Sequence, residues 1–179
     1  MPGRDVVAVF LEHGRQRYGE GVTQLEHALQ SAEHARRDGA GDDLVLAALL
    51  HDIGHLAGPR GGDSTEHDHG GDGAAIVRPF VPERVAWLIE RHVVAKRYLC
   101  TVDRAYAGQL SPASVRSLAV QGGALPEADR SRLEAHPWFA DAVRVRRWDD
   151  LAKVVGAPTA PLETYRPLLE RYFGPQSDS

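Results

Sequence analysis

The sequence predicts a compact all-α domain of six to eight helices. Apolar residues recur at helical spacing along nearly the whole chain, and strand-like alternation is absent. Prolines and cap residues stand where new apolar segments begin. Since neither a repeat nor a change of composition marks a boundary, we expect residues 1–179 to form a single domain. Its core should extend from about residue 18 to about residue 173, before a short flexible C-terminal tail.

The first half of the chain is expected to hold two helices and a loop. An apolar stripe predicts a helix over about 23–37, and Asp42 or Asp43 can cap a second helix that runs to about His55. The glycine-rich segment 58–73 breaks the helical pattern and cannot bury much apolar surface. We therefore expect this segment to be a loop.

Prolines mark the helices of the second half. Pro82 suits the first turn of a helix that ends near Lys96, where a missing backbone N–H is tolerated. Ser111 and Pro112 form a cap and first-turn pair for another helix. Further helix starts are predicted at Pro126, Pro137 and Pro161.

The composition disfavours several classes of function. The net charge of −4 gives no global electrostatic support for binding nucleic acid. No segment approaches the roughly 20 apolar residues that span a bilayer, and no signal-peptide pattern is visible. The single cysteine, Cys100, excludes an internal disulfide framework and fits a reducing compartment. We expect a cytoplasmic protein without membrane or nucleic-acid partners.

The stretch "LLHDIGHL" (49–56) resembles a buried helix but carries His51, Asp52 and His55. His51 and Asp52 leave a helix about 100° apart and can still converge on one ion, and the two oxygens of a carboxylate can bridge two ions. His55 lies one turn beyond His51, on the same face. A histidine–aspartate pair alone is a weak signal, because a hydrogen-bonded core histidine is the commoner explanation.

Other candidate ligands lie on the predicted helices. His92 continues the apolar stripe of residues 85–89, and Lys96 follows one turn later. An ionised lysine on a core face is costly unless it is paired, although it can also extend from a helix end into water. His27 has partly polar neighbours, so a surface histidine is the simpler reading there. Asp149 shares a face with Arg146, and a structural ion pair would also explain that placement.

The glycine-rich segment adds His67 and His69, which could supply a ligand or form an adventitious metal-binding surface. Imidazole and carboxylate ligands suit iron, manganese or zinc, and ligand type alone does not choose among them. Four histidines and two carboxylates are a natural set for two first-row metal ions. The candidates are His27, His51, Asp52, one loop histidine, His92 and Asp149.

The order of these residues resembles the HD-domain superfamily, whose helical fold binds one or two metals and whose members are mostly phosphohydrolases. The chain is more similar to the mixed-valence diiron oxygenases that include myo-inositol oxygenase. Among these it most resembles the small oxygenases that cleave carbon–phosphorus bonds in 1-hydroxyphosphonates. The resemblance extends from about Tyr18 to Lys153. It is carried by "QLEHALQ", "LLHDIGHL", "RHVVAKRYL", "LSPASVRSLAVQGG" and "RVRRWDDLAK".

The resemblance implies two iron ions, Fe(II) and Fe(III), with Asp52 bridging them. His69 is preferred to His67 because "GA" (73–74) follows it four residues later, as in the family pattern. One iron would be held by His27, His51, Asp52 and Asp149. The second would be held by Asp52, His69 and His92.

The resemblance also implies a substrate site. Lys96 would contact the phosphonate or the oxygen, and His55 would contact the substrate or support the ligands; these two are the catalytic candidates. A helix start with free N–H groups and hydroxyls can bind an anion. The expected substrate-binding residues are Tyr18, Glu20, His55, Lys96, Ser114, Ser117 and Arg146.

The implied reaction oxidises a 1-hydroxyphosphonate, such as 2-amino-1-hydroxyethylphosphonate, with O2 to glycine or a relative and inorganic phosphate. A hydroxylase would have to supply that substrate. Two alternatives use the same residues. One is an HD-type metal-dependent phosphohydrolase acting on a nucleotide or another phosphate monoester, and the other is a degenerate domain that binds a ligand without catalysis.

Overall fold

The computed structural model describes residues 5–17, 21–57 and 68–175. Within these ranges the chain forms eleven α-helices and one 3-10 helix, and its only β-pairing is an isolated bridge between Arg17 and Thr23. The predicted all-α class is confirmed, but the predicted number of helices is too small. The helices are α1 (Val6–His13), α2 (Gln24–Arg37), α3 (Asp42–Leu50), α4 (Ile53–Ala57), α5 (His69–Val77), α6 (Glu83–Val102), α7 (Arg104–Gln109), α8 (Pro112–Val120), α9 (Glu127–Glu134), α10 (Phe139–Leu151), η1 (Leu162–Tyr165) and α11 (Arg166–Phe173).

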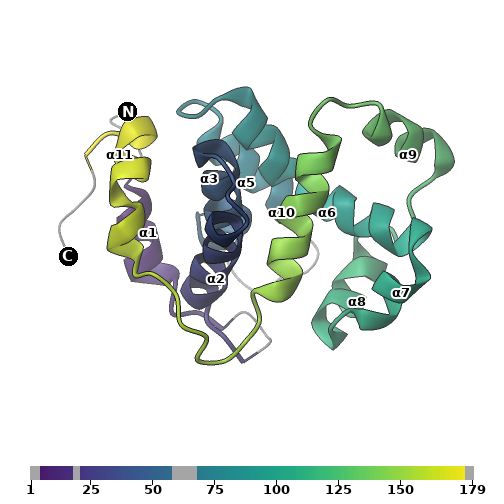
Figure 1. Cartoon of the computed structure of the whole chain (residues 1–179), viewed down its shortest axis with the longest axis horizontal. Coiled ribbons are helices and arrows are strands. Elements are labelled where there is room, and N and C mark those ends of the chain that lie inside the picture. Colours follow the sequence, from purple (N-terminus) through teal and green to yellow (C-terminus); the bar gives the residue numbers. More distant parts are fainter. Residues whose placement is uncertain (1–4, 18–20, 58–67, 176–179) are drawn as a thin grey trace.

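The helices form a bundle with its most closely packed part in the middle (Figure 1). The long helix α6 contacts α3, α5 and α10, and α2 contacts α3 and α10. Helices α1 and α11 lie together at one end of the view, and α7, α8 and α9 lie at the other end. The central helices therefore surround a common core, which is where the predicted ligands lie.

Local hydrogen bonds explain where the ligand-bearing helices begin. Thr23 and Glu26 form a capping box, in which the Thr23 hydroxyl accepts from the Glu26 amide (3.2 Å) and the Glu26 carboxylate accepts from the Thr23 amide (2.6 Å). This box fixes the start of α2 one turn before His27. The Ser111 hydroxyl caps α8 by accepting from the Ser114 amide, and Pro112 occupies its first turn, as the sequence predicts.

The predicted continuous helix from Asp42 to His55 is wrong at its centre. Helix α3 ends at Leu50, and α4 begins at Ile53 after a turn at His51 and Asp52. At this turn the Ala48 carbonyl accepts a hydrogen bond from the His51 side chain (2.8 Å). This side chain competes for the carbonyl with the backbone N–H of Asp52, its usual helical partner. The break separates the two helices at the residues proposed to bind metal.

The predicted loop over 58–73 is also wrong in its last part. Helix α5 begins at His69, because the Asp68 side chain caps it by accepting from the Gly71 amide (3.0 Å). A cap can start a helix even where glycine weakens it, and tertiary contacts supply the rest. Helix α6 also continues past Lys96 to Val102, and the short helices α1 and α7 were not expected.

Helices α4 and α5 approach so closely that Gly54 has no room for a side chain. A Cβ atom at this position would lie 2.1 Å from the His69 carbonyl oxygen and 2.8 Å from the Gly73 amide nitrogen. Both neighbours are backbone atoms, so neither can move without shifting α5. Because Gly54 has no side chain, the backbone of His69 can pack close to the turn that carries His51 and Asp52.

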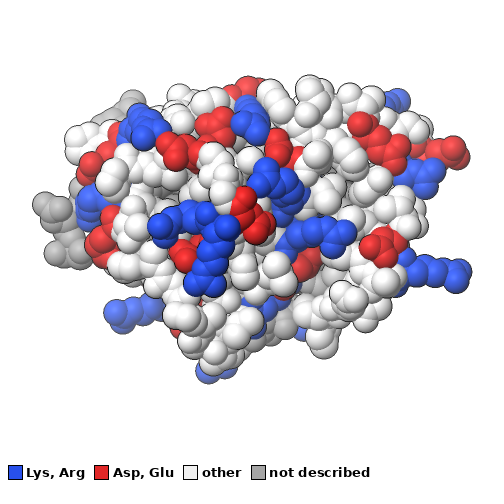
Figure 2. Space-filling model, viewed as in Figure 1, with Lys and Arg blue, Asp and Glu red and all other residues white. Residues whose placement is uncertain are grey.

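The surface mixes charges of both signs. Figure 2 shows lysine and arginine side chains interleaved with aspartate and glutamate over the face in view. Arg84 illustrates this pattern, since it reaches Asp141 of α10 (2.6 Å) and Asp43 of α3 (3.5 Å). None of the helices in the described ranges is long and apolar enough to cross a bilayer.

We predict that Gly54→Ala destabilises the protein by about 1–3 kcal/mol or more, because the methyl group forces α5 away from α4. The matched control is Gly108→Ala, since a Cβ at that position in α7 meets no atom within 4 Å. The control should be neutral or slightly stabilising. Chemical denaturation of both variants measures the difference, and equal stabilities would contradict the close packing at Gly54.

Candidate metal centre

The residues proposed as metal ligands from the sequence come together in the core between α2, α3, α5, α6 and α10. They arrive from four helices and from the α3–α4 turn, and each has at most 8 % of its surface exposed. Burying so many polar side chains together is costly unless their polar atoms find partners. The residues are His27, His51, Asp52, His69, His92 and Asp149.

Three of the four imidazoles present a lone pair to the centre of the cluster. The Nδ1 atoms of His27, His51 and His92 lie 2.7, 2.8 and 2.6 Å from the carbonyl oxygens of residues 152, 48 and 89. A carbonyl can only accept, so each Nδ1 carries a proton, and in the neutral form of such a ring Nε2 is an acceptor. This is the tautomer in which Nε2 can bind a metal.

The first group of donors contains two facing imidazoles and two carboxylates. The Nε2 atoms of His27 and His51 are 3.0 Å apart, although neither neutral ring has a proton to place between them. Asp52 Oδ2 lies 3.5 Å from each of these nitrogens. Asp149 Oδ1 lies 3.4 Å from His27 Nε2 and 4.0 Å from His51 Nε2. A cation at the centre of this group would separate the two lone pairs.

The second group uses the other oxygen of Asp52. The Nε2 atoms of His69 and His92 are 3.2 Å apart, and Asp52 Oδ1 lies 3.4 and 3.5 Å from them. The carboxylate of Asp52 therefore faces both groups, with one oxygen toward each.

The donor set fits two metal ions. Two donors bound to one ion at about 2.1 Å, at right angles or tetrahedrally, are separated by roughly 3.0–3.4 Å. Most of the distances within each group fall in or near this range. Each group would hold one ion, and Asp52 would bridge them. These ions would supply Lewis-acid and redox chemistry, which amino-acid side chains alone do not provide.

The ionisation states agree with this assignment. Burial lowers the pKa of His51 to about 4 and holds that of His69 well below its usual value, so both rings are neutral near pH 7. Burial would raise the pKa of Asp52 and Asp149, but neighbouring groups outweigh it. His51 lowers the pKa of Asp52, and Arg146 lowers that of Asp149. Neutral imidazoles with ionised carboxylates are the forms that metals bind.

His55 lies beside the second group. Its ring stacks on His69 with centroids 4.1 Å apart and planes inclined by 19°. A ligand atom of His55 also comes within 4.8 Å of ligand atoms of Asp52 and His69, so His55 is a further possible donor. It is only half-buried, which suits the contact with substrate expected from the sequence.

Two lysines and two serines form a wall next to the ligands. Lys96 is 3 % exposed and does not extend into water; its Nζ donates to Ser117 Oγ at 2.7 Å. Lys153 Nζ donates to Ser114 Oγ at 3.1 Å and lies 3.8 Å from Asp149 Oδ1. The structure thus brings Ser114 and Ser117 together with Lys96. Lys153 was not among the candidates; it lies just past the C-terminal end of α10, four residues after Asp149.

Arg146 is held by acids and a tyrosine. Its Nη1 donates to Asp149 Oδ2 (2.6 Å), its Nη2 contacts Asp150 Oδ1, and its Nε donates to the Tyr106 hydroxyl (3.0 Å). That hydroxyl in turn donates to Asp150 Oδ2 (2.6 Å). Arg146 therefore orients Asp149 so that its other oxygen faces the metal ligands. The expected phosphonate contact has to use the guanidinium N–H groups that remain.

Tyr106 and Asp150 were missed in the sequence. Tyr106 is the one buried residue of the short helix α7, whose position depends on tertiary contacts that periodicity does not show. The expected substrate-binding residues Tyr18 and Glu20, and the alternative loop ligand His67, lie outside the described residues.

Residues 24–131 match the family described as HD domain. They include the helices that carry His27, His51, Asp52, His69 and His92, whereas Asp149 lies further along the chain. The chain therefore belongs to the HD-domain family.

Within this family the chain is similar to two phosphonate dioxygenases. It is 41 % identical, over 94 % of its length and 88 % of the relative, to hydroxymethylphosphonate dioxygenase of Gimesia maris. It is 33 % identical, over 91 % of its length and 86 % of the relative, to [1-hydroxy-2-(trimethylamino)ethyl]phosphonate dioxygenase (glycine-betaine-forming) of Leisingera caerulea. An uncharacterized protein of Acanthamoeba polyphaga mimivirus is 32 % identical over 97 % of this chain and 83 % of its own.

We predict that His69→Ala lowers the metal content by about one ion per chain, because the second group then keeps one imidazole. His34→Ala, a half-buried change on α2 away from the cluster, is the control and should leave the content unchanged. Metal analysis of the purified variants measures this. If His67→Ala lowers the content and His69→Ala does not, the loop ligand is His67.

We predict that Tyr106→Phe destabilises the protein by about 1.5–3 kcal/mol, because Arg146 and Asp150 both lose a buried hydrogen-bond partner. The matched control is Tyr172→Phe, whose hydroxyl makes a longer contact to Asp43 (3.3 Å) in a less buried setting. Its effect should stay below about 1 kcal/mol. Denaturant unfolding compares the two, and equal losses would show that the Tyr106 hydroxyl adds nothing special.

Proposed function

We propose that this protein is an iron-dependent oxygenase that cleaves the carbon–phosphorus bond of a 1-hydroxyphosphonate. One substrate and one O2 would give one carboxylate and one inorganic phosphate. The four electrons that reduce O2 come from the substrate, so the reaction needs no external reductant. The observation that carries the proposal is the shared Asp52 carboxylate between two imidazole pairs, beside a buried lysine–serine wall.

The two named relatives support this reaction class. Both are called dioxygenases of phosphonates that bear a hydroxyl group on the carbon bonded to phosphorus. The two named phosphonates differ in the rest of the molecule. The substrate expected from the sequence, 2-amino-1-hydroxyethylphosphonate, shares this reacting group. We propose the common 1-hydroxyphosphonate unit as the recognised feature, so all three compounds are candidate substrates.

The residues of the chain would divide the work as follows. Lys96 and Lys153 bring positive charge to the phosphonate, and Ser114 and Ser117 hold the two ammonium groups in place. Arg146 holds Asp149 and so fixes one ligand. Two iron ions bound by the six ligands would polarise the substrate oxygens and exchange electrons with O2. The burial of this cluster limits the access of water.

The reaction needs a source of its substrate. A phosphonate with an unsubstituted carbon next to phosphorus has to be hydroxylated at that carbon before this chemistry can act on it. We therefore propose that a hydroxylase precedes this enzyme.

The experiment that tests the proposal joins metal analysis of anaerobically purified protein to an oxygen-electrode assay with the three phosphonates. About two irons per chain, with O2 uptake matched by phosphate release, would support the oxygenase. Phosphate release from ordinary phosphate monoesters, without O2 uptake and without iron, would instead establish the phosphohydrolase. Stable folding and ligand binding without metal or turnover would favour a non-catalytic domain.

We predict that Lys96→Ala leaves the fold and the iron content nearly intact but removes turnover of the phosphonate. Its ammonium contacts a serine and no proposed metal ligand, so iron should remain. Arg116→Ala is the control, because Arg116 is exposed on the same α8 that carries Ser117. Melting curves, iron analysis and oxygen uptake measure the three properties. Unchanged turnover in Lys96→Ala would remove the residue from the catalytic site.

We predict that phosphonate affinity falls as the pH rises through about 8. Burial and the neighbouring Arg146 lower the pKa of Lys96 to about 8, so its ammonium is present below that pH and lost above it. Titrations of substrate binding between about pH 7.5 and 9.5 should show this fall. Any binding by Lys96→Arg should lack it, since arginine stays charged there. A flat wild-type profile would mean that Lys96 does not bind the phosphonate as a cation.

A further inference from the structure

A second cavity lies on the other side of α6 from the metal centre, between α6 and α9. Its volume is about 460 Å³, which is in the usual range for small-ligand pockets. Trp87, Arg91 and Val94 are spaced three or four residues apart and line it from one face of α6. His92 and Lys96 leave the same helix toward the core. The cavity is therefore separate from the proposed phosphonate site.

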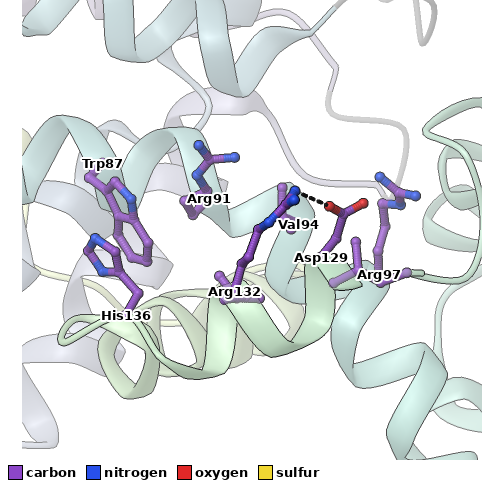
Figure 3. Close-up of a pocket in the computed structure, with 9 residues that line it drawn as sticks. Trp87, Arg91, Val94, Arg97, Asp129, Arg132 and His136 are labelled. Carbon is purple, nitrogen blue, oxygen red and sulfur yellow. Dashed lines mark hydrogen bonds and ion pairs between the residues drawn. The ribbon is translucent and has the colours of Figure 1, made fainter. Parts of the chain in front are cut away.

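Three arginines and one acid line this cavity. Figure 3 shows Arg132 and Asp129 on α9, joined to each other, with Arg91 and Arg97 reaching the cavity from α6. Like charges gathered at one cavity repel one another, and a bound anion relieves that repulsion. Asp129, which pairs with Arg132, and Glu90, which pairs with Arg91 from outside the lining, offset only part of the charge of the three arginines.

The arginines keep donors that the protein does not use. Arg97 is fixed, because its Nε and Nη2 donate to the carbonyls of residues 122–124, but its Nη1 has no partner among the described residues. Arg91 pairs only through Nη2 with Glu90 (3.0 Å) in the described part of the chain. The Arg132 Nη1 forms an ion pair with Asp129 (3.3 Å), and the side chain is 81 % exposed, so it has room to change its rotamer. Guanidinium groups with spare N–H groups bind phosphate in a fork geometry.

The opposite end of the cavity is aromatic. The rings of Trp87 and His136 stack in parallel, with centroids 3.9 Å apart and planes inclined by 10°. Figure 3 shows this pair beside the arginine side. Val94, Leu125 and Leu133 add apolar lining. A flat ring attached to an anionic group would match both ends of the cavity, because aromatic faces favour stacked rings.

We propose that this α6–α9 cavity binds an organic phosphate whose body contains a flat ring. The phosphate meets Arg91, Arg97 and Arg132, and the ring lies against the Trp87–His136 end. This site is independent of the proposed oxygenase reaction and does not require metal.

Calorimetric titration of the whole protein with adenosine monophosphate tests the site. The expected result is saturable binding that is clearly tighter than that of adenosine or of inorganic phosphate, which each lack one half of the ligand. Arg91→Gln should weaken binding about tenfold or more, the usual effect of losing a hydrogen bond to a charged group. Arg171→Gln makes the same charge change on α11 away from the cavity and should leave the affinity unchanged.

Lys96→Ala separates this cavity from the metal centre. Unchanged binding of adenosine monophosphate in this variant, together with weaker binding in Arg91→Gln, would support the proposal. Loss in Lys96→Ala with full binding in Arg91→Gln would place the nucleotide at the metal centre and overturn it. Absence of binding at millimolar concentration would also overturn it, as would equal affinity for adenosine or for inorganic phosphate.

Discussion

Two pairs of facing imidazoles, with the Asp52 carboxylate between the pairs, organise the interior of this protein. His27 and His51 meet at 3.0 Å, and His69 and His92 meet at 3.2 Å, with one oxygen of Asp52 directed to each pair. Backbone carbonyls hold the proton of three of these rings on the outer nitrogen. These contacts bring acceptors together in a dry core, an arrangement that a cation within each pair would stabilise. The helices around the cluster therefore place these donors where metal ions could bind, in addition to packing their apolar faces.

A further set of side chains supports Asp149, the last of the proposed ligands in the sequence. Arg146 binds Asp149 on one side and Asp150 with Tyr106 on the other, so α7 and α10 are joined at the edge of the cluster. An arginine between several acids keeps its charge at any ordinary pH, because the nearby carboxylates raise its pKa despite burial. The orientation of Asp149 thus depends on Arg146, which Tyr106 and Asp150 hold in place from outside the proposed ligand set.

Much of the fold and of the candidate site could be predicted from the sequence. Helical spacing and caps indicated α2, α6 and α8, and the motif order brought the six proposed ligands into one list before the structure placed them together. Periodicity could not show the break at His51, because a side-chain hydrogen bond to the Ala48 carbonyl causes no change in the apolar pattern. Nor could it show that His69 starts a helix among glycines, because the Asp68 cap leaves no trace in the apolar pattern, or that Tyr106 reaches Arg146, which lies 40 residues away.

The two donor groups differ in how much chain they enclose. Asp52, His69 and His92 lie within one continuous segment, whereas His27 and Asp149 belong to the first and last helices of the central bundle. The His27 ring is also hydrogen-bonded to the Ala152 carbonyl, 125 residues away. An ion held there would act as a cross-link that closes almost the whole bundle, and closing a longer loop removes more entropy from the unfolded chain. One ion would then complete a local unit, and the other would tie the two ends of the fold together.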